Sequence, residues 1–331
     1  MILTYDQIRA VTTGAAEIVA DGDTFGFHRF TTAQSECYKA LRSVDFYNKT
    51  FGTADIRLAF TTDSDTLAFS YKMENRGSSR KYAYIDVTVN GVLIGHFGGH
   101  FGNIAGVASL TLGGYTVGRE KLVEIYLPWS KAAWLAGVTL DDGAALLPAK
   151  RAKTMLCYGD SITHGYDAVY PSRSYTSRLS QMLGADAHNR AIGGDSFFPE
   201  LLELDEPVSP DIVTVAYGTN DWNKHNAVHS ARMCGEFYRR LSAKFETAVI
   251  YAITPIWRGD FEKETPFGAP AYETEALIRR CTESLPNVRV IPGWNLVPHD
   301  PGFMADKFLH PNDLGFAEYA QGLYAAIRED A

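Results

Sequence analysis

The sequence has few cysteines, no basic stripe and no long apolar run, and each shortage excludes a class of protein. Its four cysteines, Cys37, Cys157, Cys234 and Cys281, form no Cys-x-x-Cys pair, which argues against structural zinc and predicts reduced, mostly packed thiols. No apolar run approaches the ~18 residues of a membrane-spanning helix, so no membrane partner is expected. A net charge of −8 argues against a nucleic-acid partner, which needs a basic face.

Other signals are missing as well. The amino terminus has no basic region followed by an apolar stretch, so we see no secretory signal and expect a cytoplasmic protein. The glycine-rich residues 97–102 do not match a phosphate loop and precede no helical pattern, so we interpret them as a loop. No cofactor and no metal are predicted, and no pattern indicates an oligomeric state.

The sequence does have enough apolar residues, 46 %, for a large core, and it changes character near residue 150. A chain of 331 residues is long enough for two domains. We predict an amino-terminal domain at residues 1–150 and a carboxyl-terminal domain at residues 151–331.

The first part is predicted to be all-β. Strand-like runs cover residues 54–60, 66–71, 82–89, 92–95, 107–112, 121–127 and 138–140. Asn90-Gly91, between two of these runs, is a strong hairpin signal because both positions require positive φ. Strands at this spacing favour a β-sandwich or jelly roll. Its Phe and Tyr residues either fill the core or hold a sugar polymer, and the sequence leaves both open.

The second part alternates strand-like and helix-like segments. Strands are expected at residues 154–158, 187–192, 211–217, 248–253 and 288–291, and helices at 174–183, 230–245, 272–284 and 314–328. Strands separated by helices indicate an α/β fold, with a mostly parallel sheet covered by helices on both faces.

Polar groups gather at the predicted strand ends of this second part. Ser161, Gly194 and Asn220 each follow the carboxyl end of a different strand, and His310 precedes the last helix. Such strand ends share one edge of a parallel sheet, where open α/β sheets bind ligands. A nucleophile needs a base within reach, and acyl transfer needs donors aimed at the developing oxyanion. A serine, a histidine, an accessible glycine N–H and an asparagine amide supply that set.

These residues resemble the ordered blocks of the SGNH hydrolases, also called GDSL esterases, over residues ~152–331. The blocks are Gly159-Asp160-Ser161, Gly194, Gly218-Thr219-Asn220-Asp221 and Asp306 to His310-Pro311. The resemblance implies that Ser161 is the nucleophile and His310 the general base. It also implies an oxyanion hole made by the backbone N–H groups of Ser161 and Gly194 and the Asn220 side chain.

The resemblance also predicts the fold. It implies a flavodoxin-like, three-layer α/β/α SGNH domain with a five-stranded parallel sheet. The all-β part resembles the jelly-roll domain that precedes this catalytic domain in some carbohydrate acetylesterases.

One position departs from the family pattern. The family usually places the triad acid three residues before the histidine, where this chain has Lys307, and Asp306 lies four before. We expect the loop to bulge so that Asp306 orients His310, with Asp300 or a backbone carbonyl as alternative acceptors. His164, His225, His229 and His299 are expected to be loop histidines.

These features predict a serine esterase that removes small acyl groups, with acetyl esters of carbohydrates as the expected substrate. The partner would then be a small-molecule or oligosaccharide ester. Trp222, Trp257 and Arg258 follow strand ends and are predicted to bind substrate, with packing at the rim of the pocket as the alternative.

Three alternative functions remain open from the residues alone. The first is an esterase or lipase for simple alkyl or aryl esters. The second is a metal-dependent phosphoesterase that uses Asp160, Asp195 and Asp221, which also lie at strand ends. The third is a carbohydrate-binding protein without activity. The second and third would leave the serine, asparagine and histidine unused.

Overall fold

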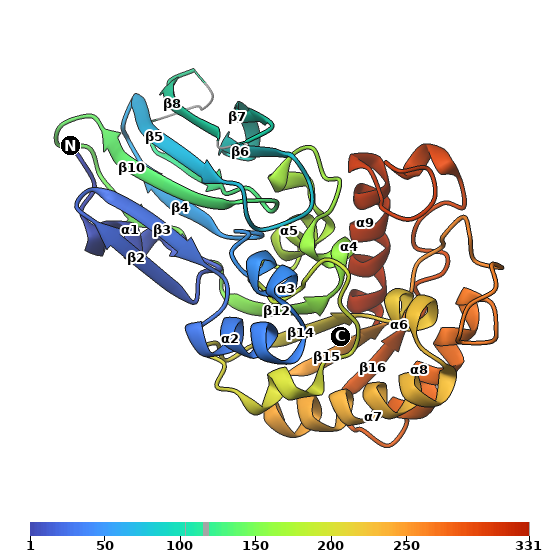
Figure 1. Cartoon of the computed structure of the whole chain (residues 1–331). Helices are drawn as coiled ribbons and strands as arrows, with labels where there is room; N and C mark the ends of the chain where they lie inside the picture. Colours follow the sequence, from blue (N-terminus) through green and yellow to red (C-terminus); the bar gives the residue numbers. More distant parts are fainter. Residues whose placement is uncertain (103, 115–118, 331) are drawn as a thin grey trace.

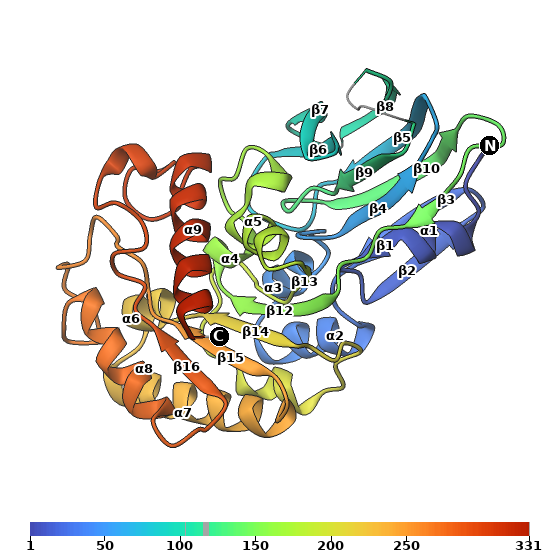
Figure 2. The ribbon, with the colours of Figure 1, turned by 180° about the vertical axis from the view of Figure 1, so that it is seen from behind.

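The computed structural model describes residues 1–102, 104–114 and 119–330 and contains three β-sheets (Figure 1). Two antiparallel sheets lie in the amino-terminal part, and a parallel sheet with helices on both faces lies in the carboxyl-terminal part. Figure 2 shows the same two parts from behind. The last antiparallel strand, β11, ends at Pro148, and the first parallel strand, β12, begins at Lys153.

The two antiparallel sheets pack on one shared core. The first has the order β2 (Glu17–Asp21), β3 (Thr24–His28), β10 (Ala132–Leu140), β5 (Thr66–Glu74) and β8 (Ile104–Thr111). The second has the order β1 (Thr12–Thr13), β4 (Arg57–Thr62), β9 (Lys121–Tyr126), β6 (Tyr82–Val89) and β7 (Val92–His100), with β11 (Leu147–Pro148) paired to β4. Phe25, Phe27 and Phe69 from the first sheet share a buried cluster with Phe60 from the second. These aromatic residues therefore fill the core.

The hairpin predicted at Asn90-Gly91 is confirmed, because both residues have positive φ, 48° and 79°, and join β6 to β7. The interpretation of residues 97–102 as a loop is wrong for residues 97–100, which belong to β7. A Cβ added at Gly98 would lie 2.0 Å from the carbonyl oxygen of Ala83 on β6. This glycine therefore serves a close approach of two strands.

The prediction of an all-β first part missed three helices: α1 (Tyr5–Val11), α2 (Thr32–Leu41) and α3 (Val44–Lys49). Thr4 and Thr31 form capping boxes with glutamines three residues later, a signal that the sequence contains. Both views show α2 and α3 beside the parallel sheet. Tyr38 of α2 is fully buried and packs 5.0 Å, between ring centroids, from Phe198. The first part of the chain thus contributes to the core of the second.

The five-stranded parallel sheet is confirmed. Its order is β13 (Ala185–Asn189), β12 (Lys153–Gly159), β14 (Ile212–Ala216), β15 (Val249–Ile253) and β16 (Val288–Ile291), with every neighbouring pair parallel. Counted along the chain this is the flavodoxin-like order 2-1-3-4-5. Successive residues of β12 enter different cores: Met155 and Cys157 join one cluster, and Leu156 and Tyr158 the other. Burial on both faces explains why this strand is a continuous apolar run.

The helices cover the two faces of this sheet. On one face lie α5 (Tyr175–Met182) and α9 (Asp313–Asp330), and on the other α7 (Ala227–Lys244) and α8 (Thr274–Thr282). The short helices α4 (Ser161–His164) and α6 (Thr219–Lys224) follow β12 and β14. None of the helices in the described ranges is both long and apolar enough to cross a membrane. All four cysteines are free, as predicted.

Candidate active site

Ser161 is placed by the sharp turn between β12 and α4. The Asp160 carboxylate accepts a hydrogen bond from the Ile162 N–H at 3.0 Å and caps this helix, of which Ser161 is the first residue. A Cβ at Gly159 would lie 2.2 Å from the Thr163 hydroxyl oxygen, so the turn requires glycine there. Ser161 is largely buried, with 7 % of its surface exposed.

His310 lies between Ser161 and Asp306. Its Nε2 is 2.9 Å from the Ser161 Oγ, and its Nδ1 is 2.6 Å from an Asp306 carboxylate oxygen. With a carboxylate on Nδ1, that nitrogen carries the proton and Nε2 is free to accept one from the serine. The three side chains thus form a continuous hydrogen-bonded chain with the geometry of a general base and a nucleophile.

The loop around Lys307 explains how an acid four residues away reaches the histidine. Lys307 has a φ of +74°, and the other Asp306 oxygen accepts hydrogen bonds from the N–H groups of Phe308, Leu309 and His310 at 2.8–3.1 Å. Burial raises the pKa of Asp306, but the bonds from His310 and from these N–H groups outweigh it and bring that pKa below its usual value. Asp300, the alternative acceptor, instead bonds the Gly302 N–H at 2.7 Å.

A second carboxylate, that of Asp167, approaches the same histidine and was missed by the sequence analysis. Its oxygen lies 3.7 Å from His310 Nδ1. Arg80 of the first part donates two hydrogen bonds to Asp167, both at 2.6 Å, and the Tyr82 hydroxyl lies 3.2 Å away. The Tyr166 ring stacks on His310 with centroids 5.8 Å apart. No local motif marks Asp167, because its neighbours come from residues more than 80 positions away.

Gly194 and Asn220 lie on two adjoining loops at this edge of the sheet. Gly194 has a φ of +88°, and the Asn220 amide nitrogen donates to the carbonyl oxygen of Asp195 at 2.9 Å. The Ile192 N–H bonds the carbonyl of Gly159, which ties the Gly194 loop to the end of β12. One hydrogen of the Asn220 amide therefore holds the loop and the other remains for a ligand.

The expectation of loop histidines is wrong for His229, which lies in α7, and for His164. His164 is fully buried in α4, and its Nδ1 accepts a hydrogen bond from the Gly193 N–H at 3.2 Å. Its Nε2 lies 3.1 Å from the carbonyl oxygen of Trp129. Burial, aided by the charge of Arg29, lowers the pKa of His164 well below its usual value, so the ring is neutral. This histidine positions the Gly193–Gly194 loop.

The three aspartates considered as metal ligands point to different donors. The Asp195 oxygens accept hydrogen bonds from the Tyr38 hydroxyl at 2.9 Å and from the Ser196 N–H at 3.0 Å. An Asp221 oxygen accepts one from the Phe197 N–H at 3.3 Å. Burial raises the pKa of Asp160 and of Asp195 to about 6 and that of Asp221 to about 7. Among the described residues these three aspartates do not form a group with the spacing of a metal site.

One group of described residues has the spacing of a metal site: Asp167, Asp306 and His310. Its ligand atoms already bond one another and Arg80. The arrangement is therefore better suited to holding the histidine than to holding an ion.

Two of the predicted substrate-binding residues are buried and already hydrogen-bonded within the chain. Trp222 is fully buried, and its indole N–H donates to the carbonyl of Ala269 at 2.7 Å. Arg258 is buried as well and is paired with Asp260 at 2.6 Å and with the Thr219 hydroxyl at 2.8 Å.

Trp257 is 8 % exposed and stacks on His299, with the two ring planes 15° apart. The alternative that these side chains pack around the site agrees with their burial. In particular, Arg258 steadies the turn that carries Asn220.

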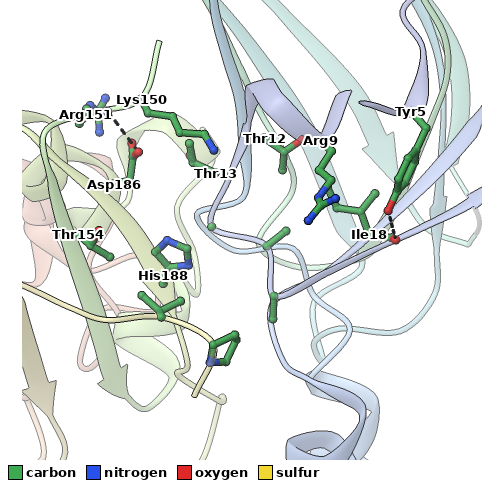
Figure 3. Close-up of a pocket in the computed structure, with 15 residues that line it drawn as sticks. Tyr5, Arg9, Thr12, Thr13, Ile18, Lys150, Arg151, Thr154, Asp186 and His188 are labelled. Carbon is green, nitrogen blue, oxygen red and sulfur yellow. Dashed lines mark hydrogen bonds between the residues drawn. The ribbon is translucent and has the colours of Figure 1, made fainter. Parts of the chain in front are cut away.

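A cavity of about 550 Å³ lies elsewhere, between the two parts of the chain (Figure 3). Figure 3 shows Tyr5 and Arg9 on one side and Asp186 and His188 on the other. Asp186 and Thr154 mark the amino ends of β13 and β12, whereas Ser161 follows the carboxyl end. A much smaller cavity of about 20 Å³, bordered by Asp160, Ile162 and Thr219, lies under the turn that carries Ser161, and Ser161 does not line it. That is room for about one water-sized group.

Comparison with known proteins gives a family for the second part of the chain. Residues 157–317 match the GDSL-like Lipase/Acylhydrolase family. This segment contains the serine, glycine, asparagine and histidine described above. No curated protein matched the sequence.

Solved structures resemble the whole chain in fold. A salicylyl-acyltransferase, SsfX3, from a tetracycline biosynthetic pathway superposes with a TM-score of 0.80 at 20 % identity, over 96 % of this chain and 94 % of that one. A putative GDSL-like lipase from Bacteroides ovatus gives 0.75 at 19 % identity, with the same coverage. A family two carbohydrate esterase from Cellvibrio japonicus gives 0.63 at 16 % identity, over 98 % and 96 %. Similarity at these identities supports the fold of both parts.

Proposed function

Because residues 157–317 form a GDSL-like lipase/acylhydrolase domain, we propose that the chain is a serine esterase that removes small acyl groups, with acetyl esters of carbohydrates as its substrates. The observation that carries the proposal is the hydrogen-bonded chain from Ser161 through His310 to Asp306. Carbohydrate esterases among the solved structures of the same fold support the substrate class.

The first half of the reaction forms an acyl-enzyme. His310 Nε2 takes the proton of the Ser161 hydroxyl as the oxygen attacks the ester carbonyl carbon. Asp306 stabilises the imidazolium that results, because its carboxylate bonds Nδ1. The N–H groups of Ser161 and Gly194 and the Asn220 amide donate hydrogen bonds that stabilise the negative charge on the carbonyl oxygen. His310 then gives its proton to the departing sugar oxygen.

The second half returns the enzyme to its starting state. A water loses a proton to His310 and attacks the acyl carbon, and the Ser161 oxygen leaves as the proton returns to it. No metal or cofactor enters these steps. Water must reach the acyl carbon for hydrolysis, so an alcohol in its place would give acyl transfer.

Small acyl groups fit the surroundings of the nucleophile best. Phe197 and Phe198, which follow Gly194, are both 2 % exposed, and we expect these bulky side chains to leave little room for a long acyl chain. An esterase for simple alkyl or aryl esters remains the alternative if the alcohol part proves unimportant.

We also infer that the antiparallel part is a jelly roll. Its eight main strands pair from the outside in: β3 with β10, β4 with β9, β5 with β8, and β6 with β7. Folding one long antiparallel ribbon into two sheets produces this pairing.

The test is a comparison of the wild-type protein with Ser161→Ala on acetylated oligosaccharides and on 4-nitrophenyl esters. We expect acetate release that requires Ser161, and covalent labelling of the wild type by a serine-directed phosphonate. Adding an alcohol to the assay measures how much of the acyl group is transferred to it instead of to water. Hydrolysis that survives Ser161→Ala contradicts the mechanism, and a preference for alkyl over sugar acetates contradicts the substrate class.

A further inference from the structure

We propose that Lys49, from the amino-terminal part of the chain, is a positioning residue that orients the Gly194 N–H toward the reacting ester oxygen. Lys49 is the last residue of α3, and its Nζ donates to the carbonyl oxygen of Gly193 at 3.0 Å. The inference rests on the proposed function, because it concerns the oxyanion hole of that reaction.

The argument begins with the polar backbone groups of Gly193 and Gly194. The Gly193 N–H bonds His164, the Gly193 carbonyl bonds Lys49, and the Gly194 carbonyl bonds Lys224 at 2.5 Å. Within the described part of the chain, the Gly194 N–H has no acceptor. Three of the four groups are therefore held, and the free one is a donor at the edge of the sheet that carries Ser161.

A planar peptide links the held carbonyl to the free N–H. In a trans peptide the C=O of one residue and the N–H of the next point in opposite directions. Lys49 on the Gly193 carbonyl therefore turns the Gly194 N–H away from α3. The lysine charge also polarises the same peptide, which strengthens its N–H as a donor.

This peptide needs an external restraint because it joins two glycines. Gly194 has a φ of +88°, and glycine reaches both signs of φ at little cost, so the peptide can turn over. Gly193 cannot be replaced by a stiffer residue, because a Cβ there would lie 2.5 Å from the Tyr166 ring. A lysine from another part of the chain supplies the rigidity that these two residues lack.

Lys49 is itself held in place. Its side chain is 13 % exposed, its Nζ pairs with Asp45 at 2.7 Å, and it lies 5.2 Å from the centre of the Phe46 ring. Asp45 is 69 % exposed in this pair, so solvent screens much of its contribution. Asp45→Asn is therefore a suitable control that removes the ion pair and leaves the bond to Gly193.

Lys224→Met is the matched comparison, since it also removes a lysine from a carbonyl of this loop. Lys224 bonds the Gly194 carbonyl, which belongs to the next peptide, and the N–H of that peptide, on Asp195, already bonds the Ile192 carbonyl at 3.0 Å. That peptide keeps its orientation without the lysine. The loss of activity should therefore be smaller than for Lys49→Met.

The experiment measures kcat and KM for an acetyl ester with the full-length wild type, Lys49→Met, Lys49→Arg, Lys224→Met and Asp45→Asn, with Ser161→Ala as the reference for loss of chemistry. Removing an oxyanion donor costs about 10²–10³ in kcat, and misorienting one should cost about 10–100-fold. For Lys49→Met we expect that loss of kcat, with KM within about twofold of the wild-type value. For Lys49→Arg we expect kcat within about threefold of the wild type, because arginine can also donate to the Gly193 carbonyl. The affinity for a tetrahedral boronate should fall in parallel with kcat.

Three results would overturn the proposal. The first is near-normal kcat in a folded Lys49→Met protein. If Lys49→Met does not fold, the equivalent result is a loss of kcat in folded Lys49→Arg while the affinity for the boronate stays unchanged. The second is a rise in KM alone, which would make Lys49 a substrate-binding residue. The third is an equal loss in Lys224→Met, which would point to charge rather than peptide orientation. Activity that persists in Ser161→Ala would overturn the proposed function as well.

Discussion

Replacing Asp306 by asparagine tests how the histidine of the site is held. The asparagine oxygen can still accept the three backbone N–H groups of residues 308–310, so the loop should keep its shape. The new NH₂ group, however, takes the position 2.6 Å from His310 Nδ1. Two donors cannot face each other, so the imidazole moves its proton to Nε2. That nitrogen then donates to Ser161 instead of accepting its proton.

The size of the loss depends on the second carboxylate. In a serine protease this change of tautomer lowers kcat by about 10⁴, which is about 5.4 kcal/mol at 1.36 kcal/mol per tenfold. Here the Asp167 oxygen is only 3.7 Å from His310 Nδ1 and can accept its proton after a small shift of the ring. Arg80 occupies both Asp167 oxygens, which weakens this rescue. We therefore expect a loss of about 10²–10³ for Asp306→Asn, below the serine-protease value.

The double variant separates the two acids. Asp167→Asn alone should change kcat by less than about fivefold, because Asp306 still holds the ring. Adding Asp167→Asn to Asp306→Asn should carry the loss toward about 10⁴. Both effects are read from kcat for an acetyl ester, with thermal unfolding as the check that the loop remains intact. A double variant within tenfold of wild type, or a single Asp167→Asn as damaging as Asp306→Asn, would refute this account of the histidine.

Four further outcomes can be measured separately. Ser161→Ala should lower turnover by about 10³-fold or more and leave the melting curve unchanged, and near-normal activity would reject it as the nucleophile. Asn220→Ala should cost about 2.7–4 kcal/mol of transition-state stabilisation, seen in kcat, whereas an effect on KM alone would make it a binding residue. Asp221 keeps its proton in the folded protein up to about pH 7 and loses it nearer pH 4 when unfolded, so its contribution to stability is full below about pH 4 and is lost as pH rises from there through about 7. Asp221→Asn should therefore stabilise the protein at pH 8 but not at pH 4, and equal unfolding free-energy changes at the two values would contradict this. Along a series of acyl esters kcat/KM should fall beyond acetyl, because each methylene that the site cannot seat loses about 1–3 kcal/mol of transition-state binding. A maximum of kcat/KM at octanoyl would indicate a lipase-like groove.

The parallel sheet could be predicted because its signals are local. Residues 154–158 form a run buried on both faces, and the predicted helix at 174–183 corresponds to α5 at Tyr175–Met182. The helix α2 was missed because it has few large apolar residues besides Tyr38, and Tyr38 packs against a distant segment. In that case tertiary contacts decide the structure and hydrophobic periodicity carries little information.

The residues of the site also differ in whether a local signal in the sequence marks them. Motif order drew attention to Ser161, Asn220 and His310, because each motif directly follows a strand or precedes a helix, and the structure places Ser161 and His310 within hydrogen-bond distance. Burial of Trp222 and Arg258 could not be inferred, since the order of residues after a strand does not say which way a side chain points. Asp167, which lies near His310, is hydrogen-bonded by Arg80, and a pair 87 positions apart leaves no local pattern.

The contacts between the two parts indicate that the first is a structural component of the site. Arg29 is fully buried and donates to the backbone carbonyls of Asn189 and Ala191, directly before the Gly193–Gly194 loop. Arg57 of β4 pairs with both Glu124 and Asp186 of β13, again in buried surroundings. Removing one partner of such a pair leaves a buried charge uncompensated, which costs several kcal/mol. Separating the parts would expose all of these groups at once, so the parallel sheet and the antiparallel sheets stabilise each other, and the loop that carries Gly194 depends on both.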